Sequence, residues 1–252
     1  MPELSFELVD ETTFEEIPAP SQPGARCQTC DYWDRLDGGR DLPEGHQADG
    51  PRRAAAKLDR LLAGRRLTGA YGMLARSTDT VERVAVGYAQ FGPISAYPRA
   101  QVIRDRYADL PDSPAPWVVT CLQVDPLRSG PERDAVATAL LRAVCDELDR
   151  RGIGAVEAYP EAAPEPWQPS AGPASVYVSA DFAHVAGDDR YPVYRRELSG
   201  EADDEAWGRL LRRGEPEDTD DWPLPMPKGP DEKDFFRLPP DKPRRPNPFG
   251  DD

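Results

Sequence analysis

The sequence predicts a mixed α/β fold in one main domain with acidic ends, and three observations support this prediction. Between residues 24 and 199, apolar runs typical of strands alternate with segments whose apolar residues recur at helical spacing. The formal net charge of −15 is concentrated at the ends, with −6 in residues 1–23 and −6 in residues 200–252. Ten of the 29 prolines fall in residues 200–252, where each removes a backbone hydrogen-bond donor.

The charge and proline pattern predicts three segments. Residues 1–23 form an acidic N-terminal extension, residues 24–199 form the folded domain, and residues 200–252 form an acidic, proline-rich tail. Both ends are expected to be disordered, the tail over most of its length, because such segments bury too little apolar surface to offset chain entropy.

The first half of the domain reads as a helix followed by strands. A helix is expected over residues 51–63, opened by Pro51 and closed by Gly64. Two strands are expected over residues 67–76 and 82–92, and they are followed by a loop over residues 93–116. The continuous apolar run "WVVTCLQV" then predicts a central strand over residues 117–124.

The second half begins with an amphipathic helix, in which Val136, Leu140, Val144 and Leu148 step at i+4. The glycines at 152 and 154 end this helix, and "AVEAYP" returns as a strand over residues 155–160. A short helix is expected over residues 174–182, and the final strand over residues 191–198.

Composition excludes some classes of partner and location. No apolar run approaches the roughly 18–20 residues that cross a bilayer, and the acidic N-terminus has the wrong charge for a secretory signal. We therefore expect a cytoplasmic protein with no membrane partner, whose four cysteines are reduced thiols. The acidic balance also argues against nucleic acid, because phosphate contacts need clustered Lys and Arg.

The second half contains a match to the line "L-x-V-x-P-x-x-R-G-x-G-x-G-x-x-L-L", made by Leu122, Val124, Pro126, Ala135, Ala137, Leu140 and Leu141. This pattern resembles the GNAT superfamily of acyl-CoA-dependent N-acyltransferases. A second element, "L-Y-E-x-x-G-F", is matched by "VYVSADF", with Tyr177 and Phe182 in register. The resemblance covers residues 24–199, and it implies a mixed, mostly antiparallel sheet flanked by helices. The opening "CQTCDYWD" further resembles a branch that begins with a CxxC-x-YW element.

The resemblance also implies a binding site for the cofactor. Backbone groups of Leu122, Gln123 and Val124 would pair with the pantetheine arm, and one N–H would point at the thioester carbonyl. The phosphate motif Q/R-x-x-G-x-G/A falls on Glu132, Ala135 and Ala137, so an acid replaces the expected cation and Pro131 removes a donor. The residues expected to hold the pyrophosphate are Arg128, Gly130, Arg133, Ala135, Val136, Ala137 and Thr138.

Candidates for the chemistry follow from acyl transfer to an amine. Tyr177 occupies the general-acid position of the family, the alternative being an aromatic that packs the helix. Glu157 is the candidate general base, projecting from its strand into a cleft, the alternative being an edge or surface acid. Glu161, His184 and Asp125 are weaker candidates for the base.

The Cys27–Cys30 pair is a CxxC motif, whose spacing suits zinc as well as thiol chemistry. A tetrahedral zinc site needs two more ligands, which His46 with Asp41 or Glu44 could supply. A structural role, a metal and thiol chemistry therefore remain alternatives, and we expect no metal.

Two functions are compatible with these features. The first is an N-acetyltransferase that uses acetyl-CoA and an amine acceptor, as a monomer or homodimer, with an acceptor pocket lined by residues 92–111. The second is a non-catalytic GNAT-like module that binds acyl-CoA, or nothing, and acts through its acidic tails. The degraded phosphate motif favours the second, whereas Tyr177, Glu157 and the intact "LQV" strand favour the first.

Overall fold

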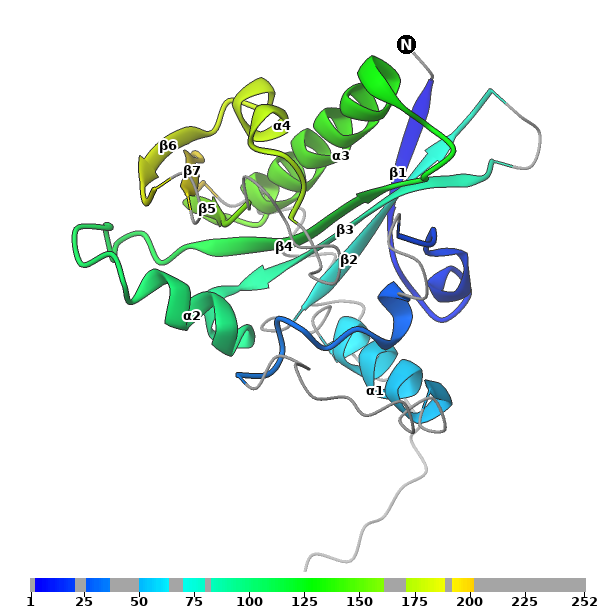
Figure 1. Cartoon of the computed structure of the whole chain (residues 1–252), viewed down its shortest axis with the longest axis horizontal. Helices are drawn as coiled ribbons and strands as arrows, with labels where there is room; N and C mark the ends of the chain where they lie inside the picture. Colours follow the sequence, from blue (N-terminus) through cyan, green and yellow to red (C-terminus); the bar gives the residue numbers. More distant parts are fainter. Residues whose placement is uncertain are drawn as a thin grey trace, which may run out of the picture. The chain divides into compact units, whose positions relative to one another are not determined.

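The computed structural model describes residues 3–20, 26–36, 50–63, 70–79, 83–160, 171–188 and 192–201 (Figure 1). All of them lie in the first of two compact units, residues 1–214. The second unit, residues 215–252, lies outside the described residues, as does the rest of the segment after residue 201. The prediction of a disordered tail therefore falls outside them as well.

Among the described residues, seven strands form one sheet in the order β1-β2-β3-β4-β5-β7-β6. Every neighbouring pair is antiparallel except β4 and β5, which are parallel. This mixed, mostly antiparallel sheet confirms the predicted fold class. The strands are β1 (Leu4–Leu8), β2 (Tyr71–Ser77), β3 (Ala85–Pro93), β4 (Trp117–Val124), β5 (Ala155–Ala158), β6 (Ala183–Ala186) and β7 (Val193–Glu197).

Helices cover both faces of the sheet (Figure 1). Helices α3 (Gly130–Arg150) and α4 (Ala174–Ser179) pack on one face, where their apolar residues join one hydrophobic cluster with β2–β5. Helices α1 (Gly50–Ala63) and α2 (Pro98–Arg104) belong to the cluster on the other face. That second cluster also contains residues of three short 3-10 helices, η1 (Phe14–Glu16), η2 (Cys27–Thr29) and η5 (Ile94–Ala96).

Helix α3 confirms the periodicity argument. Val136, Leu140, Val144 and Leu148 are each fully buried, as their i+4 spacing predicts. Strand β4 also has the predicted bounds, and all of its residues except Trp117 are buried, as a continuous apolar run implies for a central strand.

The predicted loop over residues 93–116 is wrong in part, because it contains helix α2. Pro98 stands in the first turn, where its missing N–H has no intrahelical partner to lose. Tyr97 and Ala100 are fully buried and fasten this segment to the sheet. A helix of seven residues offers too few turns for an apolar stripe to be recognised in the sequence.

The prediction of a disordered N-terminal extension is also wrong for the described part of residues 1–23. Strand β1 pairs with β2, from Leu4 opposite Ser77 to Leu8 opposite Met73. Beyond it, Val9, Phe14 and Ile17 are at most 4% exposed and join the cluster that contains α1 and α2. The acids of this segment are mostly exposed, so they reflect an edge strand and its surface turn instead of disorder.

Candidate functional site

Strand β4 extends beyond the end of its parallel partner β5, and we call residues 120–124 its diverging half. Their parallel pairing runs only from Trp117 opposite Val156 to Val119 opposite Ala158, where β5 ends. Strand β4 continues to Val124, so residues 120–124 have no partner strand on the β5 side among the described residues. A strand edge of this kind can accept an extended ligand through main-chain hydrogen bonds.

A β-bulge lies where the divergence begins. In the pairing of β4 with β3, Val119 is opposite Phe91 and Cys121 is opposite Gln90, which leaves Thr120 as the extra residue. The Thr120 hydroxyl donates a hydrogen bond to the Gln90 carbonyl at 3.2 Å. Because a bulge turns a peptide out of the regular ladder, it can redirect an N–H towards a ligand. From the sequence we expect the N–H that points at the thioester carbonyl within Leu122–Val124. The sequence does not predict the bulge, because a bulge leaves no recognisable residue pattern here.

The turn that connects β4 to α3 is closed by Asp125. Its Oδ1 accepts a hydrogen bond from the Leu127 N–H at 3.0 Å, and its carbonyl accepts one from the Arg128 N–H at 2.9 Å. Helix α3 then begins at Gly130, whose φ of +53° lies in the left-handed region that favours glycine. Asp125, a weaker candidate for the base, therefore already shapes this turn.

The charges at the N-terminus of α3 are arranged differently from the sequence expectation. Glu132, the acid that replaces the family cation, forms an ion pair with Arg128 one turn before it. Arg133 is half-buried and makes no ion pair with the described residues. Ala135 and Thr138 are half-buried, while the side chains of Val136 and Ala137 lie in the core. The last two can therefore offer a ligand only their backbone.

Tyr177 of α4 is fully buried, and its hydroxyl donates a hydrogen bond to the Ala171 carbonyl at 2.5 Å. The next residue, Gly172, packs against Leu122 of β4, because a Cβ built on it would lie 3.2 Å from Leu122 Cδ2. The Tyr177 hydroxyl is thus held beside the diverging half of β4. Burial raises the pKa of Tyr177 well above its ordinary value, so the hydroxyl keeps its proton at neutral pH.

Glu157 of β5 does not project into a cleft, and it is not a surface acid either, because its side chain is fully buried. Its Oε1 accepts a hydrogen bond from Arg195 Nη1 at 2.8 Å. Its Oε2 accepts hydrogen bonds from the Tyr159 hydroxyl at 2.7 Å and from Arg104 Nε at 3.2 Å. A general base needs an accessible lone pair, whereas these contacts use both oxygens to tie α2 and β7 to β5.

Of the remaining weak candidates, only His184 lies in the described residues, and it is on the far edge of the sheet from β4. His184 lies on the edge strand β6, exposed, with its ring packed on Tyr194 at a centroid separation of 5.4 Å. Glu161 lies outside the described residues.

Cys27 begins the one-turn helix η2, and Cys30 follows its last residue. Both cysteines pack against the α1 and α2 side of the core. Burial raises the pKa of the Cys27 thiol to about 12, with the nearby Cys30 adding to the shift and Lys57 opposing it. Burial also raises the pKa of Cys30. Within the described ranges, no group of three or more His, Cys, Asp or Glu residues could hold a metal ion. His46, Asp41 and Glu44 lie outside those ranges.

We expect the two thiols of the CxxC motif to react slowly. The thiolate is the nucleophile, and a pKa raised to about 12 leaves far less of it at pH 7.5 than free cysteine has. Alkylation of Cys27 by iodoacetamide, followed by mass spectrometry of its peptide, should be more than ten times slower than alkylation of free cysteine. A rate equal to that of free cysteine would show that this thiol is exposed in solution.

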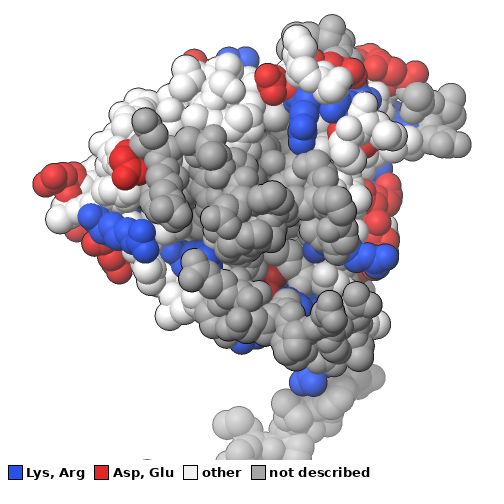
Figure 2. Space-filling model, viewed as in Figure 1, with Lys and Arg blue, Asp and Glu red and all other residues white. Residues whose placement is uncertain are grey.

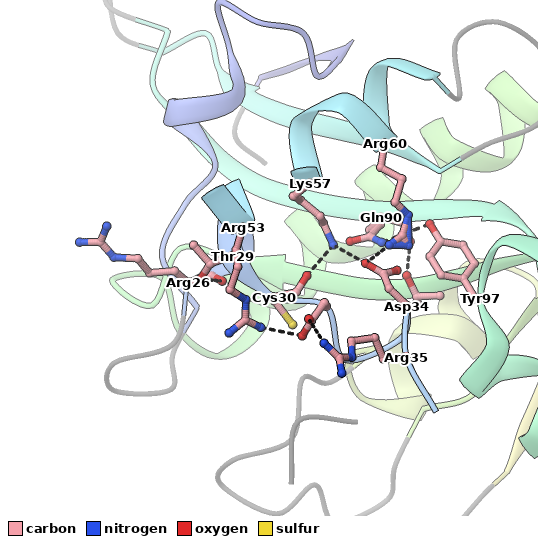
Figure 3. Close-up of polar contacts among 12 residues, drawn as sticks. Arg26, Thr29, Cys30, Asp34, Arg35, Arg53, Lys57, Arg60, Gln90 and Tyr97 are labelled. Carbon is pink, nitrogen blue, oxygen red and sulfur yellow. Dashed lines mark hydrogen bonds and ion pairs between the residues drawn. The ribbon is translucent and has the colours of Figure 1, made fainter. Parts of the chain in front are cut away.

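A polar cluster that the sequence analysis did not predict lies on the same face as η2, between α1 and the sheet (Figure 3). The Asp34 side chain, only 4% exposed, lies 3.6 Å from Lys57 Nζ and also forms an ion pair with Arg60 Nη1. Beside it, Gln90 Nε2 donates a hydrogen bond to the Tyr97 hydroxyl at 3.2 Å. The only sequence pattern that could have indicated this cluster is the i+3 spacing of Lys57 and Arg60 on the polar side of a helix. The same pattern is equally typical of a helix face exposed to solvent.

The surface and the helices carry less information about the function. On the face shown in Figure 2, basic and acidic side chains of the described residues intermix. No helix among the described residues is both long and apolar enough to cross a bilayer.

No family model and no curated protein matches this chain. Solved structures do resemble it. The C-terminal condensation domain of Ebony, in complex with beta-alanyl-dopamine, is 11% identical with a TM-score of 0.50 and covers 79% of this chain and 100% of that domain. A histone acetyltransferase HPA2 and related acetyltransferase from Corynebacterium glutamicum is 14% identical with a TM-score of 0.45 (79% and 98% covered). A GNAT-family acetyltransferase from Listeria monocytogenes is 12% identical with a TM-score of 0.45 (78% and 96% covered). At such identities the likeness concerns the fold alone, and the match to the condensation domain, with its TM-score of 0.50, carries it.

Proposed function

We propose that the chain is an acyl-CoA-dependent N-acyltransferase of the GNAT superfamily, which transfers an acetyl group from acetyl-CoA to an amine. The observation that carries the proposal is the end of the β4–β5 pairing at Val119, on a strand that continues to Val124 and leads directly into the N-terminus of α3. An edge for an extended arm and a helix N-terminus for its phosphates then lie at one end of the sheet.

The pantetheine arm would pair with the β4 edge over residues 120–124. Backbone recognition of this kind tolerates a change of side chains, so the missing family glycines do not affect it. The bulge at Thr120 would supply the N–H that stabilises the thioester oxygen as negative charge develops on it.

The pyrophosphate would lie against the first turns of α3. Exposed N–H groups and the helix dipole favour an anion there, although Pro131 removes one donor. Because Arg128 pairs with Glu132, the acid at the family's cation position is already neutralised. Arg133, which has no ion-pair partner among the described residues, is then the cation available for a phosphate.

For the chemistry, we assign the general acid to Tyr177. Its hydroxyl is protonated and held beside β4. During the reaction this hydroxyl would exchange its hydrogen bond to the Ala171 carbonyl for one to the departing thiolate, and would give its proton to the sulfur. We assign Glu157 to the ion pairs that fix α2 and β7, because both of its oxygens are engaged. We also propose that the chain belongs to the branch of the superfamily that begins with a CxxC-x-YW element. In support of this proposal, Tyr32 and Trp33 of the element lie in the core.

Replacing Arg133 with alanine should weaken acetyl-CoA binding by about 1–2 kcal/mol, because a charge-assisted contact to phosphate is lost. Calorimetric titration of the full chain with acetyl-CoA and with CoA measures this change. Arg150→Ala is the matched control, since Arg150 lies on the same helix about 26 Å further along its axis. Equal affinities of the wild type and Arg133→Ala would remove Arg133 from the site, and no binding by the wild type would refute the proposed function.

The non-catalytic alternative is favoured by one observation, the loss of a donor at Pro131 within the first turn of α3. It predicts that CoA binds weakly or not at all and that no amine is acetylated. Release of free thiol from acetyl-CoA in the presence of polyamines, amino acids and aminoglycosides separates it from the enzyme.

A further inference from the structure

We propose that Oδ1 of Asp34 is the binding point for the amino group of the acceptor, a primary amine. That the amine is an acyl acceptor rests on the proposed function. The amine site itself follows from the Asp34 oxygen that has no hydrogen-bond donor and from its place beside the bulge of β4.

The Asp34 carboxylate is buried with one oxygen unused. The contacts recorded for its ion pairs with Lys57 and Arg60 are both made by Oδ2. Oδ1 has no hydrogen-bond donor among the residues that the structure describes. A buried carboxylate oxygen without a donor costs free energy, so a ligand that supplies an N–H donor would be favoured there.

The carboxylate is held in place from two sides (Figure 3). Lys57 is fixed because its ammonium also donates a hydrogen bond to the Cys30 carbonyl at 2.8 Å. The segment that carries Asp34 is fixed a second time, since the Trp33 carbonyl accepts a hydrogen bond from the Arg99 N–H of α2 at 3.5 Å. Such a preorganised acceptor loses little entropy when a donor binds it.

The position of Asp34 relates it to the diverging strands. In Figure 3 its side chain lies beside Gln90 and Tyr97, and the Gln90 carbonyl accepts the hydrogen bond of Thr120, the bulge residue. Electrostatics agree with this placement, because Asp34 contributes, after burial, to raising the pKa of Tyr97. The unpaired oxygen therefore lies on the face opposite α3, from which an acceptor would approach a thioester held along β4.

The local charges indicate which form of the amine fits. Lys57 and Arg60 together exceed the single charge of Asp34, so a further cation is disfavoured and a neutral amine is preferred. The neutral form is also the nucleophile that acyl transfer requires. A primary amine has two N–H donors, one for Oδ1 and one that remains free.

Calorimetric titration of the full chain, saturated with CoA, with butylamine, putrescine and β-alanine tests this site at pH 8.5. Only about 1% of an amine with a pKa near 10.4 is neutral at this pH, so each affinity is calculated from the concentration of the neutral form. We expect at least one of the three amines to bind the wild type, and Asp34→Asn to weaken its binding at least tenfold. Asp31→Asn is the matched control, because Asp31 lies in the same segment but pairs with Arg53 at 2.7 Å. This control should bind as the wild type does.

A second variant guards against misfolding. Asp34→Glu retains the charge for Lys57 and Arg60 but displaces the oxygen, so it should melt close to the wild type and still bind the amine more weakly. No binding of any of the three amines by the wild type, or equal binding by the wild type and both Asp34 variants, would overturn the proposal. If CoA fails to bind, the same titration without CoA decides the amine site, so the failure of the acyltransferase proposal remains distinguishable.

Discussion

Replacing Phe14 with alanine is expected to lower the free energy of unfolding by about 3–5 kcal/mol, the range usual for removing a buried aromatic ring. Phe14 is 3% exposed and packs in the cluster that joins the N-terminal segment to α1 and α2. Its loss would leave a cavity beneath η1. The effect would be large compared with the roughly 5–15 kcal/mol that stabilises a typical domain.

Chemical denaturation followed by tryptophan fluorescence measures this change. Glu15→Ala is the control, because the neighbouring Glu15 is exposed and should be replaced with little effect. Removal of residues 1–23 should be still more damaging, since it also removes β1 from the sheet. A truncated chain that melts at the wild-type temperature would restore the view of residues 1–23 as a dispensable extension.

Replacing Tyr177 with phenylalanine is expected to reduce turnover by roughly 10²–10⁴-fold while acetyl-CoA affinity changes little, because a general acid acts on the transition state. The phenylalanine keeps the ring contact with Phe182, whose centroid lies 5.3 Å away. It removes the hydrogen bond to the Ala171 carbonyl, so some loss of stability is expected as well.

Steady-state turnover of an amine found in the thiol-release screen, with acetyl-CoA affinity measured separately, provides the test. Tyr159→Phe is the matched control, because its hydroxyl is also buried but hydrogen-bonds to Glu157. This control should lose stability without losing turnover of the folded enzyme. Wild-type turnover in Tyr177→Phe would show that the leaving thiolate takes its proton elsewhere.

The parts of the fold that the sequence predicted are those in which one periodicity runs long enough to be read. Helix α3 is 21 residues long, and its apolar face repeats over more than three turns, from Val136 to Leu148. Strand β1 has five residues at a sheet edge, where Glu7 pairs with Arg76 in place of a continuous apolar pattern. Edge strands tolerate charge, so their composition resembles that of an unstructured acidic segment.

The candidate site was likewise predictable only in part. The connection from Leu122 to α3 was predictable because it is local in the chain. The role of Glu157 depends on Arg195 and Arg104, which are 38 and 53 residues away from it in the chain. The role of Asp34 depends on Lys57 and Arg60, which are 23 and 26 residues away. Nothing in the local sequence distinguishes a carboxylate with both oxygens bound from one with a free oxygen, because that difference arises only when distant helices pack against a strand.

The pairing of β1 with β2 has a consequence for biosynthesis. Leu8 of β1 lies opposite Met73, so β1 leaves the ribosome before its partner and lacks it until about 65 more residues are made. At roughly 5–20 residues per second, this interval lasts on the order of 3–13 seconds. During that time Val9, Phe14 and Ile17 have no core to enter, and the nascent chain depends on its acidic residues, and on any chaperone that binds it, to stay apart from its neighbours.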